Sequence, residues 1–142
     1  MTEREKIRMK IAILEDQPDI LELLTTALEL AGHRAYPYCT GTSLVETLFT
    51  PQSKHTSLPF DLLIIDLYLP GTPSGLEVIN AIHQHIPLGT LPIILTSATS
   101  QSELSDMEAQ LPTVTFLRQP FHLKDLLALI ERRAISPTPC SA

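Results

Sequence analysis

Three carboxylate side chains stand directly after short apolar runs, at places where a strand would end. Glu15 and Asp16 follow the run IAIL, and Asp66 follows the run LLII. Ser97 and Gln119 lie at the ends of two further apolar runs. Carboxylates held close together repel one another unless a cation lies among them, and hard oxygen ligands suit Mg²⁺. The pattern predicts a divalent-metal site, provided that one fold brings these strand ends together.

The fold that would position these residues alternates strands with helices. Four apolar runs predict strands at 11–14, 62–65, 93–95 and 114–117, the segment 33–39 also reads as a strand, and apolar residues at helical spacing follow each one. Such alternation produces a parallel sheet with helices on both faces, whose strands end at one common edge. Pro37 lacks an N–H and predicts that its strand lies at the edge of the sheet. We expect one α/β domain with a three-layer, doubly wound, five-stranded parallel sheet.

Two connecting segments complete this prediction. Residues 50–59 are polar and flanked by prolines, which predicts a loop. The segment after Asp66 is rich in turn-forming residues, and we expect a turn that contains Pro70, Gly71, Pro73 and Gly75.

The site residues also have ordinary structural explanations. Asp16 or Ser97 could cap the helix that follows it, and Asp66 could be a turn residue. Taken one at a time, capping is the favoured explanation for Asp16 and Ser97. Three such coincidences at successive strand ends are less probable than a shared site, and together they favour a site.

Composition limits the classes of protein that fit. The 142 residues suffice for one domain, and 44% of them are apolar, which fits a globular chain with a buried core. A net charge of −6 argues against direct binding of nucleic acid. Two cysteines without a CxxC pair, no signal peptide and no apolar run of about 20 residues predict a cytoplasmic protein without a membrane segment.

Four segments resemble the response regulator receiver family. DLLIIDLYLPG is similar to the phosphoacceptor strand and its loop, and it is the most specific of the four. IAILEDQPDI resembles the first strand with its acidic pair, LPIILTSA the fourth strand, and FLRQPF the fifth. The resemblance runs from about residue 8 to about residue 133 and implies the flavodoxin-like strand order 2-1-3-4-5. We expect a leader at 1–7, a receiver domain at 8–134, and a flexible tail or linker from 135 to 142.

The resemblance also implies roles for individual residues. Asp66 would accept a phosphoryl group from a histidine kinase or phosphotransfer protein, with Mg²⁺ as cofactor. Asp16, Asp66 and the backbone carbonyl of Tyr68 would bind the metal, and Glu15 would assist through water. Ser97 would be the hydroxyl that binds the phosphoryl group. The domain would not be an enzyme beyond assisting its own phosphorylation and dephosphorylation.

The sequence departs from the family at the fifth strand. The family's lysine is replaced by Gln119, which can donate a hydrogen bond but carries no charge. Arg118 should point to the opposite face, although its long side chain could curl around the strand end, and His122 has less claim. Phe116 occupies the switch-aromatic position without a hydroxyl. We expect metal binding and phosphoryl transfer to survive, with altered switching.

Two residues beside the site correspond to family positions that tune loss of the phosphoryl group. These are Tyr68 and Thr99, and the bulk of Tyr68 could shield the acyl phosphate from water.

Three functions compete. The first is a phosphoaccepting signalling domain that acts through the face of the fourth helix, fifth strand and fifth helix, on an unknown downstream protein or output domain. The second is a pseudo-receiver that binds partners without phosphorylation, which Gln119 favours and the acidic residues disfavour. The third is a flavodoxin-like enzyme, but no GxGxxG pattern follows the first strand. A homodimer through the last helix is a further expectation, and the chain could be a stand-alone regulator or a fragment.

Overall fold

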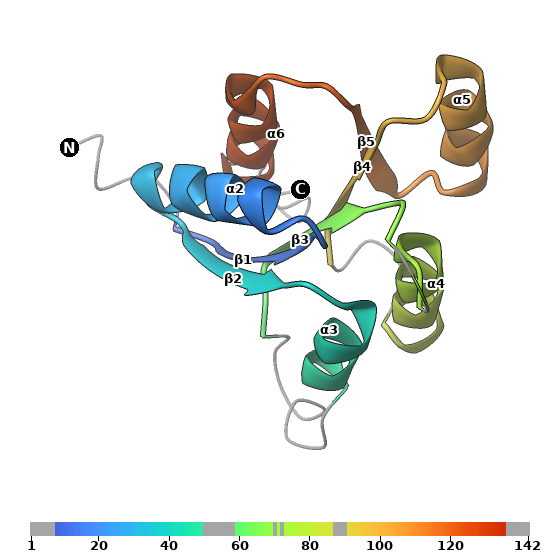
Figure 1. Cartoon of the computed structure of the whole chain (residues 1–142), viewed down its shortest axis with the longest axis horizontal. Coiled ribbons are helices and arrows are strands. Elements are labelled where there is room, and N and C mark those ends of the chain that lie inside the picture. Colours follow the sequence, from blue (N-terminus) through green and yellow to red (C-terminus); the bar gives the residue numbers. More distant parts are fainter. Residues whose placement is uncertain (1–7, 50–58, 70, 72, 87–90, 136–142) are drawn as a thin grey trace, which may run out of the picture.

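A computed structural model describes residues 8–49, 59–69, 71, 73–86 and 91–135 of the chain. Strands and helices alternate along these residues (Figure 1). Their bounds are β1 Lys10–Leu14, α2 Pro18–Leu30, β2 Arg34–Tyr38, α3 Gly41–Leu48, β3 Leu62–Asp66, α4 Gly75–His85, β4 Ile93–Ser97, α5 Gln101–Gln110, β5 Val114–Arg118 and α6 Leu123–Ile135. The five strands form one sheet in the order β2-β1-β3-β4-β5, with every pair parallel. The predicted flavodoxin-like sheet is confirmed.

Apolar cores fill both faces of the sheet. Helices α3 and α4 contribute to one core together with Met107 of α5, and helices α2 and α6 contribute to the other. Figure 1 shows α2 and α6 on one side of the sheet, with α3 and α4 on the opposite side. Leu63 and Ile65 of β3 belong to the first core, and Leu62 and Ile64 to the second. Each of these four side chains is buried, which contributes about 1.5–3 kcal/mol apiece to stability.

The strand register brings the predicted site residues to one edge. Leu14, the last residue of β1, pairs with Ile65 of β3. Glu15, which follows β1, therefore lies beside Asp66, the last residue of β3. Asp66 pairs in turn with Thr96 of β4. Because parallel strands end at the same edge, three neighbouring strands deliver their last residues to one place.

Local signals in the sequence set several boundaries. Pro18 is the first residue of α2, where a missing N–H costs no helical hydrogen bond. Gly32 adopts a φ of 99° just beyond this helix, in the left-handed region that favours glycine. Pro37 lies in β2 at the edge of the sheet. The edge position predicted from Pro37 is confirmed.

Gly75 departs from the prediction, because it begins a helix and is not part of a turn. Ser74 caps α4, since its hydroxyl accepts from the Glu77 N–H while the Glu77 carboxylate accepts from the Ser74 N–H at 2.8 Å. A Cβ atom at Gly75 would overlap the carbonyl oxygen of Asp66 and lie 2.9 Å from Cα of Leu67. Only glycine fits so close to this backbone. The start of α4 therefore presses against the strand end that carries Asp66.

Some predictions fall outside the described residues. They are the leader at 1–7, nearly all of the polar loop at 50–59, Pro70 of the expected turn, and the tail from 136 onward. Helix α6 runs through Ile135, one residue beyond the expected domain boundary. None of the helices in the described part of the chain has the length and apolar character needed to cross a bilayer.

Candidate functional site

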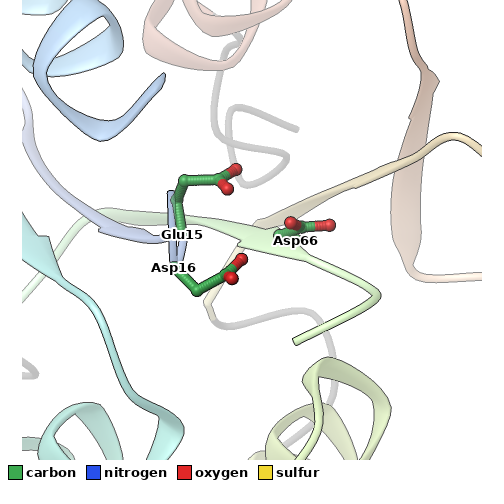
Figure 2. A group of neighbouring side chains, drawn as sticks. All are labelled: Glu15, Asp16 and Asp66. Atoms are coloured by element: carbon green, nitrogen blue, oxygen red, sulfur yellow. The ribbon is translucent and has the colours of Figure 1, made fainter. Parts of the chain in front are cut away.

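Three carboxylates converge at the carboxyl edge of the sheet. Glu15 and Asp16 follow β1, and Asp66 ends β3, the strand beside it. Each offers an oxygen, and these three oxygens all lie within 4.8 Å of one another. Figure 2 shows the carboxyl groups of Glu15 and Asp16 turned toward Asp66. The predicted acidic cluster is confirmed, and its all-oxygen donor set fits a hard divalent cation such as Mg²⁺.

The capping explanations for Asp16 and Ser97 are wrong. Gln17 is the N-cap residue of α2, and no side chain caps that helix end. Ser100 is the N-cap residue of α5, where its hydroxyl accepts from the Glu103 N–H. Neither Asp16 nor Ser97 is therefore needed to begin a helix.

The turn explanation for Asp66 holds alongside the site explanation. Its Oδ1 accepts a hydrogen bond from the Tyr68 N–H at 3.2 Å, as a turn-forming aspartate does. This bond fixes the carboxyl group beside Glu15 and Asp16. The expected role of the Tyr68 carbonyl as a metal ligand stays a prediction.

The surroundings raise the proton affinity of two of the carboxylates. Burial is the largest of the causes that raise the pKa of Glu15 to about 7; the nearby charges of Asp66 and Asp16 also raise it, and the hydrogen bond from the Gln17 N–H at 3.2 Å opposes the shift. Burial also raises the pKa of Asp66, with a contribution from Asp16, against the hydrogen bond from Tyr68. The negative charge of the cluster is thus unfavourable on its own, and a bound cation would relieve it.

A half-open cavity of about 450 Å³ lies over the cluster. Glu15, Asp66 and Gln119 line it together, so the residue at the lysine position does reach the predicted site. The Gln119 backbone is held there, because its N–H donates to the Ser97 carbonyl at 2.6 Å. Most of the apolar lining comes from α2 and from the segment that leads into the first residue of α6: Ile20, Leu23, Leu24, Pro120, Phe121 and Leu123.

Other predicted residues lie outside this cavity. Ser97 is fully buried, and its hydroxyl accepts from the Thr99 N–H at 3.0 Å. Phe116 is half-buried and packs against the core shared by α3 and α4. Arg118 directs its Nε to the Thr99 carbonyl at 3.0 Å, which settles where this side chain goes. His122 is exposed and does not line the cavity.

Sequence reasoning missed one contributor near the site. The Glu103 carboxylate accepts a hydrogen bond from the Thr99 hydroxyl, and the Tyr68 hydroxyl donates to the same Thr99 oxygen at 3.3 Å. The order Ser100-x-x-Glu103 is a helix-start signal, and it predicts local capping only. Nothing in the spacing points to a contact with the loop before the helix.

Comparisons with known proteins agree with this geometry. The family described as response regulator receiver domain matches residues 11–131. The nisin biosynthesis regulatory protein NisR of Lactococcus lactis subsp. lactis is 30% identical over 122 residues, covering 86% of this chain and 48% of that protein. The DNA-binding transcriptional regulator NtrC of Azospirillum brasilense is 30% identical over 132 residues, covering 93% and 25%. The chain thus spans about a quarter to a half of the curated relatives it matches.

A solved structure matches over nearly its whole length. The non-phosphorylated HemR receiver domain of Leptospira biflexa superposes with a TM-score of 0.73 at 28% identity, covering 92% of this chain and 97% of that chain. A CheY-like receiver domain protein of Methanospirillum hungatei has a TM-score of 0.72 at 21% identity, covering 92% and 96%, and shows the same fold.

Proposed function

This chain belongs to the response regulator receiver domain family, and from that premise we propose that Asp66 accepts a phosphoryl group from a phosphohistidine, with Mg²⁺ bound at the acidic cluster. The observation that carries the proposal is the convergence of three carboxylate oxygens within 4.8 Å of one another, two of which, from Glu15 and Asp66, belong to residues that line one cavity. A fold alone would not require three acidic residues there, since their mutual repulsion is costly.

The chemistry assigned to Asp66 is a phosphoryl transfer. A carboxylate oxygen of Asp66 attacks phosphorus, the phosphorus–nitrogen bond of the donor breaks, and its electron pair returns to the imidazole nitrogen. The Tyr68 N–H holds the carboxyl group in position from the other oxygen. Mg²⁺, when bound by Asp16, Asp66 and the Tyr68 carbonyl with help from Glu15, supplies positive charge beside the phosphoryl oxygens. Correct positioning and stabilisation of charge suffice for this transfer, because in the transition state the bonds to phosphorus are largely broken and little covalent chemistry is left for the protein.

The lining of the cavity indicates where the donor protein approaches. Ile20 and Leu23 of α2 are 37% and 51% exposed, although both are large and apolar. They share the cavity with Asp66 and Phe121. A phosphohistidine that reaches Asp66 has to bring the surface of its protein, a histidine kinase or a phosphotransfer protein, against these side chains. We assign this apolar rim to donor contact.

Further expectations belong to the same proposal. The phosphorylated domain would act through the face of α5, β5 and α6 on a downstream protein or an attached output domain, with a homodimer as one form of that contact. With a net charge of −6, the chain itself would not bind nucleic acid. We expect a cytoplasmic location, and no catalytic activity beyond assistance to its own phosphorylation and dephosphorylation.

One observation favours a second function. Gln119 lines the cavity where the family has a lysine, so this site lacks that cation. A binding module that works without phosphorylation would tolerate this loss.

Intact mass spectrometry separates the two functions. The protein and its Asp66→Asn variant are incubated with acetyl phosphate, with and without Mg²⁺. A gain of one phosphoryl group that needs both Mg²⁺ and Asp66 supports the receiver chemistry. No gain, while a control receiver domain reacts, replaces it with the phosphorylation-independent module.

A further inference from the structure

Thr99 is bound at each of its polar atoms by a different part of the fold. Its N–H donates to Ser97 Oγ at 3.0 Å, and its carbonyl accepts from Arg118 Nε of β5 at 3.0 Å. Its hydroxyl donates to the Glu103 carboxylate of α5 and accepts from the Tyr68 hydroxyl at 3.3 Å. Thr99 itself is 7% exposed, whereas Tyr68, Glu103 and Arg118 are exposed residues, so the bonds between them are partly buried. We call the three contacts from Arg118, Glu103 and Tyr68 the Thr99 latch.

The residue held by the latch, Thr99, is also the hydrogen-bond partner of the Ser97 hydroxyl. This side chain is fully buried and does not line the cavity that contains Asp66, whereas its neighbours Thr96 and Ala98 do. Its oxygen is held by the N–H of Thr99. A hydroxyl that is to bind a phosphoryl group on Asp66 has to leave this position.

We propose that Thr99 is a positioning residue. Its latch holds the loop between β4 and α5 in a state in which the Ser97 hydroxyl is kept away from a phosphoryl group on Asp66. The inference rests on the proposed function and adds the means by which the unphosphorylated state is kept. Movement of Ser97 toward the phosphoryl group releases the N–H of Thr99, and the loop can then shift only if the bonds to Arg118 and Glu103 break. One event at Asp66 thereby loosens contacts to both β5 and α5, as a two-state switch requires.

The latch also explains the arginine next to Gln119. Arg118 could compensate for the missing lysine only if its side chain curled around the strand end, and instead it binds a backbone carbonyl of the loop. Its guanidinium has a fixed geometry that suits such a bond. While Ser97 is held away from Asp66, the charge of Arg118 stays at the loop and does not reach the cavity.

The size of the effect follows from the individual bonds. A hydrogen bond in a protein changes an equilibrium by roughly two- to ten-fold when it is lost. If the latched state predominates before phosphorylation, a weakened latch raises the population that can bind a phosphoryl mimic by the same factor. Loss of Arg118 or of Glu103 should therefore tighten binding of such a mimic by roughly two- to ten-fold.

The first test requires no ligand and measures amide hydrogen exchange at Thr99 in the unphosphorylated protein. Arg118→Met and Glu103→Ala should each accelerate this exchange by roughly two- to ten-fold, because the loop that holds the amide against Ser97 is released. Glu103→Gln keeps an acceptor for the Thr99 hydroxyl and should restore slow exchange. Glu108→Ala, on the same helix, is the matched control and should change nothing. Unchanged exchange in both latch variants overturns the latch.

The second test measures the half-saturating concentration of beryllofluoride, a phosphoryl mimic, in the presence of Mg²⁺. Arg118→Met and Glu103→Ala should lower it by roughly two- to ten-fold, and a double variant with Ser97→Ala should show no such gain, since no hydroxyl is left to release. If the contacts only stabilised the loop, the latch variants would change the half-saturating concentration equally with Ser97 and with Ser97→Ala.

The outcomes of the second test separate the latch from the proposed function. Wild-type protein that binds no beryllofluoride overturns the proposed function and the regulatory role of the latch with it. Wild-type binding that both latch variants leave unchanged, or weaken, overturns the latch alone.

Discussion

Replacing Asp66 by asparagine should stabilise the metal-free protein. The substitution removes one of three carboxylates whose oxygens lie within 4.8 Å of one another. The amide oxygen of asparagine can still accept the hydrogen bond that Oδ1 receives from the Tyr68 N–H. The change therefore takes away repulsion and leaves the local turn intact.

The magnitude follows from Coulomb's law at this distance. Two unit charges about 4.8 Å apart repel by about 0.9 kcal/mol in water and by about 3.5 kcal/mol at the effective dielectric of about 20 near a protein surface. Asp66 repels both Glu15 and Asp16, but the cluster is partly open to solvent, which screens the charges. Proton uptake by Glu15 relieves part of the repulsion as well. We expect a net gain of about 1–3 kcal/mol in the free energy of unfolding at pH 8, or roughly 3–10 °C in Tm.

The gain should depend on pH in a defined direction. The pKa of Glu15 is raised from 4.5 to about 7 in the folded protein, so its ionisation destabilises the fold as pH rises through this interval. Without the charge of Asp66, the pKa of Glu15 should fall but stay raised, because burial is the largest cause of the shift and is unchanged. The advantage of Asp66→Asn should thus be small at pH 5, where Glu15 is protonated in both proteins, and larger at pH 8.

Urea unfolding followed by circular dichroism, with EDTA present, measures this gain at both pH values. Glu108→Gln removes one charge from an exposed site on α5 and controls for the change in net charge. Saturating Mg²⁺ should reverse the order, because it stabilises the wild-type protein and not the variant. An equal effect at pH 5 and pH 8, or a loss of stability in EDTA at pH 8, would refute the electrostatic reasoning.

Four further outcomes are expected. Gln119→Lys should accelerate phosphorylation by acetyl phosphate roughly ten-fold, since a charged donor in the cavity binds an anion more strongly than an amide does. Intact-mass measurements at a series of times give this rate, and an unchanged rate contradicts the prediction. Tyr68→Ala should shorten the lifetime of the phosphorylated protein by exposing the acyl phosphate to water, and an unchanged lifetime would sink the shielding hypothesis. Leu28→Ala removes a fully buried side chain and should cost about 2–5 kcal/mol in urea unfolding. Gly75→Ala should cost about 1–3 kcal/mol and weaken Mg²⁺ binding measured by calorimetry, because a Cβ atom there displaces the backbone of Asp66; undiminished affinity would contradict that contact.

The fold was predictable because burial and chain geometry leave clear marks in the sequence. Four continuous apolar runs are typical of parallel strands with helices on both faces, and these strands line two cores in the structure. Pro37 located the edge strand by its missing N–H. The full strand order came from the family resemblance, since apolar runs alone do not fix which strands are neighbours.

The acidic cluster was predictable for a similar reason, as residues that end neighbouring parallel strands meet at one edge. Contacts made by loops were not. The bonds from Arg118 and Glu103 to Thr99 depend on the path of the loop after β4, which no periodicity determines. Gly75 was expected in a turn, because glycine marks turns and close backbone approaches alike, and only the structure distinguishes the two.

The close contact at Gly75 makes the two sides of Asp66 differ in how easily they can move. On the α4 side, Gly75 lies directly against the backbone of Asp66 and Leu67, and no flexible side chain lies between them that could adjust its position. On the β4–α5 flank, single polar bonds hold the loop, and each can open without disturbing a packed core. If Asp66 is phosphorylated as proposed, we therefore expect the resulting displacement to pass toward α5 and β5, because the close-packed backbone at Gly75 cannot be compressed.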